Sequence, residues 1–231
     1  MENLTVLVPF YNEENTIYAS VTKLISSLKL ERVILINDNS NDSSEKIALE
    51  LTSKYDFIEL ISSKENLGKG ASIALGLKNS ESDFIIVHDA DLEYNPTDIN
   101  KIIDAIPDNQ KEKVVILGSR FIGDIKRENI YLRTYLANKL FSYLFSIFNK
   151  FEVTDVATCY KLISKDIYKN INIEKNGFDF EIEILAKALK QCTFYAEIPI
   201  NYKGRSYKEG KKIKLSDGFR YLKAILFEYR K

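Results

Sequence analysis

Short apolar runs alternate with longer amphipathic stretches over the first 120 residues of the 231-residue chain. The runs are rich in β-branched residues, which predicts buried strands at 4–8, 33–36, 57–61, 84–87 and 114–117. Between them, apolar residues recur at helical spacing, which predicts helices over 14–28, 43–54, 68–77 and 96–106. Because strands that alternate with helices form βαβ units, we expect an α/β fold with a mostly parallel, Rossmann-like sheet and helices on both faces.

The second half of the chain has a different pattern. Residues 130–151 are apolar almost all round and rich in Tyr and Phe, which predicts one long helix. Further helices are predicted over 179–190 and 215–229, a strand over 193–198, and a mobile basic loop over 203–214. No linker is visible, so we expect a single domain over residues 1–231 with a C-terminal helical elaboration.

Composition narrows the class of protein. The 33 basic and 33 acidic residues cancel, which argues against a cationic nucleic-acid-binding protein. Two cysteines, Cys159 and Cys192, and a single histidine, His88, exclude a disulfide framework and a Cys- or His-rich metal site. No apolar run reaches the roughly 18–20 residues that cross a bilayer, and the acidic start of the chain does not resemble a signal peptide. We therefore expect a cytoplasmic protein.

Polar segments follow each of the five predicted strands, at the edge where parallel α/β sheets bind their ligands. These segments are 9–14, 37–42, 66–70, 88–93 and 118–120. Asp89 and Asp91 come directly after a buried strand, with Glu93 close behind. Carboxylates are the ligands that Mg²⁺ and Mn²⁺ prefer. A turn cap is the alternative for a lone Asp-x-Asp pair, but five converging polar segments favour a metal site.

Three other positions have two interpretations each. Asp38 either accepts hydrogen bonds from a nucleotide or closes an Asx turn. Gly68-Lys69-Gly70 is not a Walker loop; its glycines and its lysine suit either a nearby diphosphate or an ordinary helix N-terminus. His88 precedes the acid pair and, by strand alternation, points away from it, so we expect a structural role.

Seven segments together resemble the family 2 glycosyltransferases with a GT-A fold, and among these the dolichyl- or polyprenyl-phosphate mannosyltransferases and glucosyltransferases. The segments are 8–14, 37–42, 66–70, 89–96, 118–120, 154–161 and 204–213. The resemblance implies a GT-A fold in which residues 1–120, the first half, bind a nucleotide sugar and residues 121–231, the second half, bind the acceptor. The family usually has Asp-Asp where this chain has Asn37-Asp38.

The resemblance also implies roles for individual residues. Donor binding falls on Pro9, Tyr11, Asn12, Glu13, Asp38, Gly68, Lys69, Asp89, Ala90 and Asp91. A divalent metal, Mg²⁺ or Mn²⁺, falls on Asp89, Asp91 and Glu93, and the acceptor on Ser119, Arg120 and Asn138. We expect Asp91 and Arg120 to act in catalysis, with Asp155 as general base if the acceptor is a hydroxyl and Asp89 in reserve.

The expected function is an inverting, metal-dependent transfer of a hexose from a nucleotide-diphosphate sugar of the GDP-mannose or UDP-glucose type to a polyprenyl or dolichyl phosphate. The alternatives are transfer to a sugar hydroxyl in surface-polysaccharide synthesis, a sugar-nucleotide-binding subunit without turnover, and a nucleotidyltransferase, although its Gly-rich loop is missing. Basic residues such as Lys126 and Arg133 flank the aromatic stretch 130–151, so this helix contacts either a membrane surface, on its cytoplasmic face, or a second subunit.

Overall fold

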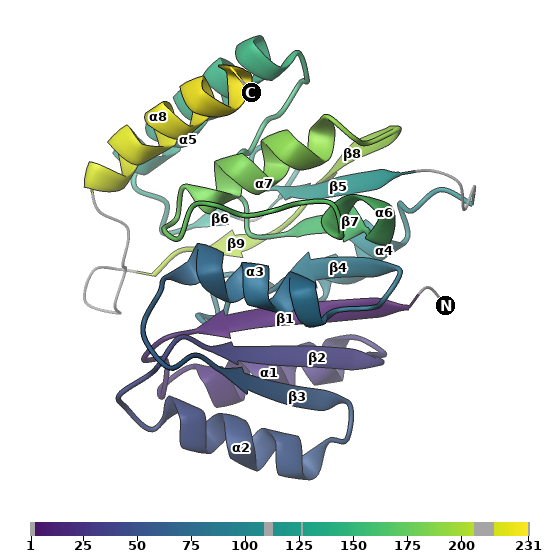
Figure 1. Cartoon of the computed structure of the whole chain (residues 1–231). Helices are drawn as coiled ribbons and strands as arrows, with labels where there is room; N and C mark the ends of the chain where they lie inside the picture. The colour runs from purple at the N-terminus through teal and green to yellow at the C-terminus, as the bar shows by residue number, and fades with distance from the viewer. Residues whose placement is uncertain (1–2, 109–112, 126, 206–214, 231) are drawn as a thin grey trace.

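Seven strands form the central sheet of the computed structural model, which describes residues 3–108, 113–125, 127–205 and 215–230 (Figure 1). Their order across the sheet is β3-β2-β1-β4-β7-β5-β8. The bounds are β1 Leu4–Phe10, β2 Arg32–Asn37, β3 Ile58–Ser62, β4 Phe84–Val87, β5 Val114–Ser119, β7 Lys161–Ser164 and β8 Phe194–Pro199. Every neighbouring pair is parallel except the two that β7 makes with β4 and β5. The expected mostly parallel α/β sheet is confirmed, and the antiparallel strand β7 was not predicted.

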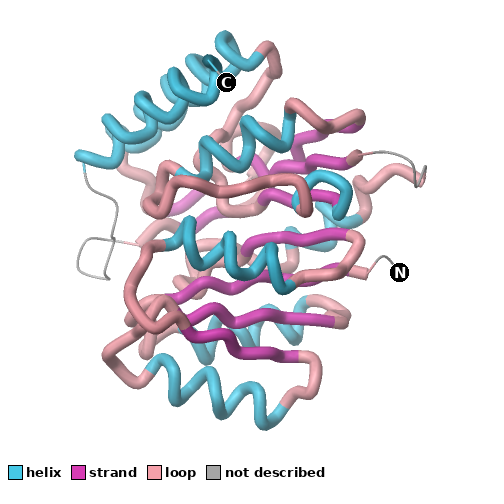
Figure 2. The backbone as a smooth tube through the Cα atoms, in the orientation of Figure 1, coloured by secondary structure: helices cyan, strands magenta, loops and turns pink. Residues whose placement is uncertain are grey.

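Helices cover both faces of this sheet (Figure 2). In Figure 1, α3 and α7 lie in front of the sheet and α1 lies behind it. The bounds are α1 Ile17–Ser27, α2 Ser44–Lys54, α3 Lys69–Asn79, α4 Asp98–Ile103, α5 Leu132–Asn149, α6 Lys165–Tyr168, α7 Phe180–Leu189 and α8 Leu215–Arg230. Each predicted helix is present with shorter or shifted ends, because the sequence pattern does not resolve capping turns. The short α6 was not predicted.

The core lies between the sheet and its helices. All seven residues of β1 are buried, as expected for a strand that is covered on both faces. The helix α3 approaches the sheet closely at Gly76, where an added Cβ would lie 2.6 Å from Cδ1 of Ile36 and 3.0 Å from Leu7. Glycine at this position lets the middle of β1 and the end of β2 pack tightly against α3.

The second half of the chain is built into the sheet of the first half. In β7, Leu162 pairs with Ile86 of β4 on one side and with Ile116 of β5 on the other. A small parallel pair, β6 (Arg127–Glu128) with β9 (Tyr202–Lys203), lies next to Tyr94, which makes a bridge to Tyr202. These pairings bring the segment that ends at residue 205 to the carboxyl end of β4.

The helix predicted over 130–151 forms as α5 and packs along α8, at the top of Figure 1. Its buried side includes Ser142 and Phe145, and the ring of Phe141 lies 5.6 Å from that of Tyr221 on α8. Lys203, expected in a basic loop, belongs to β9, and the rest of that loop from residue 206 to 214 lies outside the described residues, as does Lys126. Within the described ranges, no helix combines the length and apolar character that crossing a bilayer requires.

Candidate active site

A cavity of about 520 Å³ opens at the carboxyl ends of β1, β2 and β4. All five polar segments predicted at the strand ends reach its wall, so their expected convergence is confirmed. From the first half, the predicted residues on the wall are Pro9, Tyr11, Glu13, Asp38, Gly68, Lys69, Asp89, Ala90, Asp91, Glu93 and Arg120. The facing wall comes from the second half and includes Ala157, Cys159, Phe178, Glu181, Arg205 and Tyr221. The cavity therefore lies between the two halves.

The hydrogen bonds of Asp38 are long-range and not those of a local Asx turn, and its nucleotide contact stays a prediction. Asp38 lies on the cavity wall, and its two carboxylate oxygens accept hydrogen bonds from the main-chain N–H groups of Leu67 and Gly68, both at 2.9 Å. Each oxygen keeps a second lone pair. The carboxylate thus fixes the 66–68 turn and still presents acceptors to the cavity.

Asn12 is placed outside the cavity wall formed by the described residues. Its Oδ1 accepts a hydrogen bond from Asn41 at 2.9 Å, and its N–H donates to Ser40 Oγ at 3.1 Å. Its φ of +53° lies in the left-handed region, which Asn tolerates better than most residues. Asn12 therefore joins the segments after β1 and β2, and its expected contact with the sugar nucleotide stays a prediction.

The glycines around Lys69 make room for protein main chain. Gly68 has a φ of +98°, and a Cβ there would lie 2.4 Å from the carbonyl oxygen of Asn176. At Gly70 a Cβ would lie 2.0 Å from the carbonyl oxygen of Lys175, and the Gly70 N–H donates to Asn176 O at 2.8 Å. The sequence suggested that these glycines admit a diphosphate; the structure shows that they admit the 175–176 segment of the second half.

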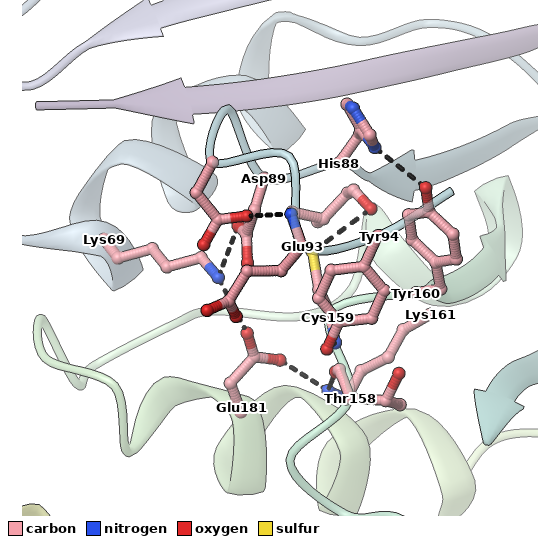
Figure 3. Close-up of polar contacts among 12 residues, drawn as sticks. Lys69, His88, Asp89, Glu93, Tyr94, Thr158, Cys159, Tyr160, Lys161 and Glu181 are labelled. Atoms are coloured by element: carbon pink, nitrogen blue, oxygen red, sulfur yellow. Dashed lines mark hydrogen bonds and ion pairs between the residues drawn. The ribbon is translucent and has the colours of Figure 1, made fainter. Parts of the chain in front are cut away.

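Lys69 lies at the centre of a buried network of charges (Figure 3). Its Nζ is 2.7 Å from Asp89 Oδ1 and 3.2 Å from Glu181 Oε1. The other Glu181 oxygen pairs with Lys161, which also donates to the carbonyl oxygen of Thr158. Burial by itself disfavours both charges, but the pairing outweighs it, so the pKa of Lys69 is raised and the pKa of Asp89 is lowered. Lys69 therefore remains cationic and Asp89 anionic.

Arg205 joins the remaining acids of the cavity. Its Nη2 is 3.0 Å from Asp91 Oδ2, its Nη1 is 3.2 Å from Glu13 Oε2, and its main-chain N–H donates to Glu93 Oε1 at 2.7 Å. The hydroxyl of Tyr202 donates to Glu93 Oε2 at 2.6 Å. Burial, followed by the charges of Asp89 and Glu93, raises the pKa of Asp91 to about 7 despite the guanidinium. Negative charge is thus in excess around Asp91.

The three predicted metal ligands do not form one cluster. No group of three His, Cys, Asp or Glu side chains stands close enough to hold a metal ion in the part of the chain that the structure describes. Asp89 contacts Lys69, whereas Asp91 and Glu93 contact Arg205. Because Asp91 and Glu93 are hard oxygen ligands with excess negative charge between them, these two residues fit a divalent cation, and Asp89 does not complete the set.

Arg120 and Asp155 form a buried bidentate ion pair. Nε and Nη2 of Arg120 each lie 2.7 Å from an oxygen of Asp155, and the Arg120 N–H donates to the same carboxylate at 3.0 Å. Asp155 is fully buried and lies off the cavity wall of the described residues. A carboxylate held by three hydrogen bonds is poorly suited to take a proton from an acceptor, so Asp155 fits a positioning role for Arg120 and not the expected role of general base.

The guanidinium of Arg120 is also enclosed by aromatic rings. Its Cζ lies 4.9 Å from the ring centre of Tyr202, 5.5 Å from that of Phe121 and 5.9 Å from that of Tyr94. Nη1 makes no hydrogen bond to any described residue, and Arg120 lines the cavity. The aromatic enclosure and Asp155 together hold one face of a fixed cation toward the cavity.

The other two predicted acceptor contacts lie elsewhere. Ser119 is fully buried, where its Oγ pairs with Thr154 Oγ1 at 2.5 Å and accepts from the N–H of Phe121 at 3.2 Å. Asn138 is half-buried on α5, away from the described cavity wall. Ser119 therefore shapes the turn after β5, and of the three expected acceptor residues only Arg120 reaches the cavity.

His88 is buried between Ser20 and Tyr160, at 3.1 Å from Ser20 Oγ and 2.9 Å from the Tyr160 hydroxyl (Figure 3). Burial lowers the pKa of His88 to about 4, so the imidazole is neutral at pH 7. A neutral ring that is hydrogen-bonded on both nitrogens agrees with the structural role expected from the sequence.

Sequence reasoning missed Lys161, Glu181 and Arg205 as members of the site. Glu181 and Glu183 are 4% and 0% exposed in the first turn of a helix that is otherwise mostly apolar, and acids in such a helix need buried partners. That signal was available in the sequence. Lys161 and Arg205 stand in two segments that resemble the family, but no role was assigned to them, because only the pairing of β7 brings Lys161 to Glu181 and only the path of β9 brings Arg205 to the cavity.

Comparison with known proteins agrees with this architecture. A dolichyl-phosphate beta-glucosyltransferase of Mus musculus is 26% identical over 222 residues, which cover 87% of this chain and 67% of that protein. A dolichol-phosphate mannosyltransferase of Pyrococcus furiosus is 25% identical over 231 residues, which cover 96% of this chain and 62% of that protein. The chain thus spans 62–67% of the length of these two relatives.

The fold is shared with a solved glucosyl-3-phosphoglycerate synthase of Mycobacterium tuberculosis, which was crystallised with Mn²⁺, uridine-diphosphate-glucose and phosphoglyceric acid. The TM-score is 0.75 at 16% identity, over 99% of this chain and 80% of that chain. This likeness confirms the GT-A architecture. The family model for "Glycosyl transferase family 2" matches residues 5–171, and with the sheet, the cavity and these relatives it establishes that the chain belongs to glycosyl transferase family 2.

Proposed function

We propose that the protein is a divalent-cation-dependent glycosyltransferase that moves a hexose from a nucleotide-diphosphate sugar to the phosphate of a polyprenyl phosphate. The observation that carries this proposal is the single cavity with Lys69, Asp91 and Glu93 on one part of its wall and the fixed guanidinium of Arg120 on another. Two anionic substrates need two separate cationic sites: Arg120 is one, and Lys69 together with a divalent cation on Asp91 and Glu93 would be the other. The named activities of the mouse and archaeal relatives support the same class of acceptor.

The donor occupies the first half of the chain in this proposal. Pro9, Tyr11 and Asp38 contact the nucleoside, and Lys69 contacts the diphosphate. Asp91 and Glu93 would hold Mg²⁺ or Mn²⁺, which when bound neutralises the charge that develops on the departing nucleoside diphosphate. In the structure, Arg205 compensates the negative charge of these two acids. When a divalent cation binds and compensates that charge instead, the guanidinium becomes available to the diphosphate.

The acceptor occupies the second half and approaches Arg120. A phosphate oxygen is already ionised at neutral pH, so it attacks the anomeric carbon without a general base while the bond from that carbon to the diphosphate breaks. One displacement inverts the configuration at the anomeric carbon. This route suits a site in which Asp155, the expected base, is held by Arg120. A hydroxyl acceptor would instead need another carboxylate of the cavity wall to take its proton.

The outer side of α5 supports a lipid-linked acceptor. A row of exposed apolar side chains runs along the helix, and these residues are 53–72% exposed: Leu132, Leu136, Leu140, Tyr143 and Ile147. On α8, Phe219 is 78% exposed. We propose that this α5 face, defined as the five residues of that row, rests on a membrane surface at the depth of the acceptor phosphate, on its cytoplasmic side. A second copy of the chain is the competing occupant.

Transfer assays with three acceptors test the proposal. UDP-glucose and GDP-mannose are each supplied with Mn²⁺ and a polyprenyl phosphate, the corresponding polyprenol, or a free hexose. We expect nucleoside diphosphate to appear together with an inverted glycosyl phosphate, only with the phosphate acceptor and only before a chelator is added. Transfer to the hexose or the polyprenol at a comparable rate, or no transfer from any nucleotide sugar, would contradict it.

A further inference from the structure

A second cavity of about 310 Å³ lies beside the active-site cavity and shares Gly177 and Arg220 with it. We call it the α8 pocket; it is bounded by residues 175–179, which lead into α7, and by residues 220–224 of α8. The sequence analysis assigned no role to either segment. The shared residues make the α8 pocket an extension of the active-site cavity on the side of the second half.

The side chains of the α8 pocket are mainly basic. Lys175, Arg220 and Lys223 face a single acid, Asp179. The Lys175 ammonium is 3.9 Å from Glu228 and 4.7 Å from the ring centre of Phe227, whereas Arg220 and Lys223 form no ion pair with any described residue. Arg220 and Lys223 are three residues apart on α8, so they lie on the same side of the helix. Among the described residues, the basic side chains of the pocket therefore outnumber the acidic ones, and Arg220 and Lys223 are available to an external anion.

The main chain adds to this positive charge. The helix α7 is ten residues long and begins at Phe180, immediately after the pocket residues Gly177 and Asp179. The N-terminal end of a helix has the positive pole of its dipole, which favours anions. The first N–H groups of α7 donate to the carbonyl oxygens of residues 177–179, so the dipole and not free N–H groups makes this contribution. Asp179 is the N-cap residue, and its negative charge compensates part of this positive potential. Two free basic side chains and a helix start at one cavity fit the oxygens of a phosphate group.

An apolar surface lies next to these charges on the same helix. Phe219 and Leu222 flank Arg220 and Lys223 in the sequence and are 78% and 37% exposed. An anion that is joined to a hydrocarbon chain would satisfy both features at once. A nucleotide, which is polar throughout, would satisfy only the first of them.

We infer that the α8 pocket binds the phosphate group of the anionic acceptor on its way to Arg120. The inference rests on the proposed function, because it takes a prenyl phosphate as the acceptor. Arg220 lines both cavities, so a phosphate held by Arg220 and Lys223 lies at the entrance to the active-site cavity. Arg120 then contacts the same group when the donor is in place.

Binding without turnover tests the site directly. Geranyl phosphate, inorganic phosphate and geraniol are titrated calorimetrically at fixed ionic strength, in the absence of donor, into the parent and an Arg220→Gln/Lys223→Gln variant. We expect the parent to bind both phosphates and not geraniol, and the variant to bind both at least tenfold more weakly. The matched control is Lys46→Gln/Lys78→Gln, which removes two exposed lysines from α2 and α3 and should leave both dissociation constants within twofold of the parent.

Vesicles separate the acceptor phosphate from ordinary lipid headgroups. If the Arg220→Gln/Lys223→Gln variant keeps its affinity for geranyl phosphate but no longer floats with phosphatidylglycerol vesicles, the pocket serves bulk headgroups and the inference is overturned. Equal phosphate affinity in parent and variant also overturns it. Arg220 and Lys223 are exposed, so an unchanged unfolding midpoint is expected for the variant.

Steady-state kinetics distinguish failure of this inference from failure of the proposed function. In the variant we expect the acceptor KM to rise at least tenfold while the donor KM stays within twofold. If the donor KM rises instead, the pocket serves the donor and the inference is wrong. If no prenyl phosphate accepts sugar in any assay while phosphate affinity still depends on Arg220 and Lys223, the proposed acceptor is wrong and the anion site is confirmed.

Discussion

Charge compensation among single side chains sets the chemistry of the cavity. Lys69 neutralises Asp89, and Arg205 contacts both Asp91 and Glu13. The acids expected to act as one ligand set are therefore divided between two basic residues. Asp91 remains the acid with the least complete compensation, as its raised pKa shows. Replacing a charged side chain by a neutral one should therefore change activity and stability most at this position.

Replacing Asp91 by Asn should abolish transfer without loss of the fold. The pKa of Asp91 is raised from 3.8 to about 7, so the free energy of unfolding falls as the pH rises from about 3.8 to about 7 and stays at the lower value above it; a neutral amide removes this penalty. We expect transfer to fall about 100-fold or more, as when one stabilising group of a transition state is lost. Assays over a Mn²⁺ titration and thermal unfolding at pH 8 measure both effects. Asp56→Asn, an exposed position on the surface, is the control; turnover near that of the parent at sub-millimolar Mn²⁺ would contradict the assignment.

The Arg120–Asp155 pair should show strong coupling in a double-mutant cycle. Removing either partner leaves the other as a buried unpaired charge, which costs about 3–5 kcal/mol of unfolding free energy. We expect Arg120→Ala and Asp155→Ala each to show a loss of that size and the double variant to lose much less than the sum. Urea unfolding provides the free energies. Additive losses would mean that the two side chains do not act as a unit.

Arg120→Lys keeps the charge in that position but removes the bidentate contact, so it tests the role of Arg120 with less damage to the fold. We expect the acceptor KM to rise more than the donor KM. A rise in the donor KM alone would place Arg120 on the nucleotide side of the cavity.

Among the secondary-structure elements, α5 differs most from an ordinary surface helix. Phe145 and the neighbouring Phe141 pack into the molecule on one side, and the α5 face is exposed on the other. Both sides are apolar, which explains why the sequence pattern showed no polar stripe. A helix of this kind requires a partner for its outer side, either lipid or protein.

Flotation with liposomes decides between these two partners of α5. We expect the parent to float with anionic liposomes at low salt and the Leu136→Gln/Leu140→Gln variant to remain at the bottom of the gradient. Leu49→Gln is the matched control, because Leu49 on α2 is 53% exposed, close to the 54% of Leu140. A parent protein that stays at the bottom with and without acceptor lipid, and sediments as a dimer, would refute the membrane assignment and favour self-association.

In the whole molecule, close main-chain contacts join the two halves in addition to the sheet that they share. The 175–176 segment of the second half packs against Gly68 and Gly70, on either side of the Lys69 that serves the site. Glu181 adds an ion pair from α7 to Lys69. The position of Lys69 therefore depends on residues more than 100 positions away along the chain.

Gly70→Ala should weaken this junction, whereas Gly218→Ala should not. A methyl group at position 70 would lie 2.0 Å from a main-chain oxygen, and we expect a loss of about 1–3 kcal/mol together with weaker donor binding. At position 218 on α8 the nearest atom, Phe141 Cζ, would be 3.5 Å away, so Ala should add about 0.5–1 kcal/mol through its helix propensity. Urea unfolding of both variants and a donor titration provide the measurements. Equal stability of the two variants would show that the 175–176 contact is not maintained in solution.

The sequence by itself determined the elements whose side chains are buried on a regular period. The strands β1, β2 and β4 are continuous apolar runs because both faces of a parallel sheet are covered, and the acids after β4 follow directly from where that run ends. The convergence of polar strand ends on one cavity was accessible because parallel strands place their carboxyl ends at one edge of the sheet, and the family resemblance because each matching segment is a short local motif.

Only the tertiary structure determined which charged side chains pair and where the second half of the chain joins the sheet. The strand β7 has four residues, beginning with the buried Lys161, and nothing in so short a run indicates that it lies antiparallel between β4 and β5. That placement brings Lys161 to Glu181, and the path through β9 brings Arg205 to Asp91. Long-range ion pairs cannot be derived from local periodicity, because they depend on the relative positions of elements that are far apart in the sequence.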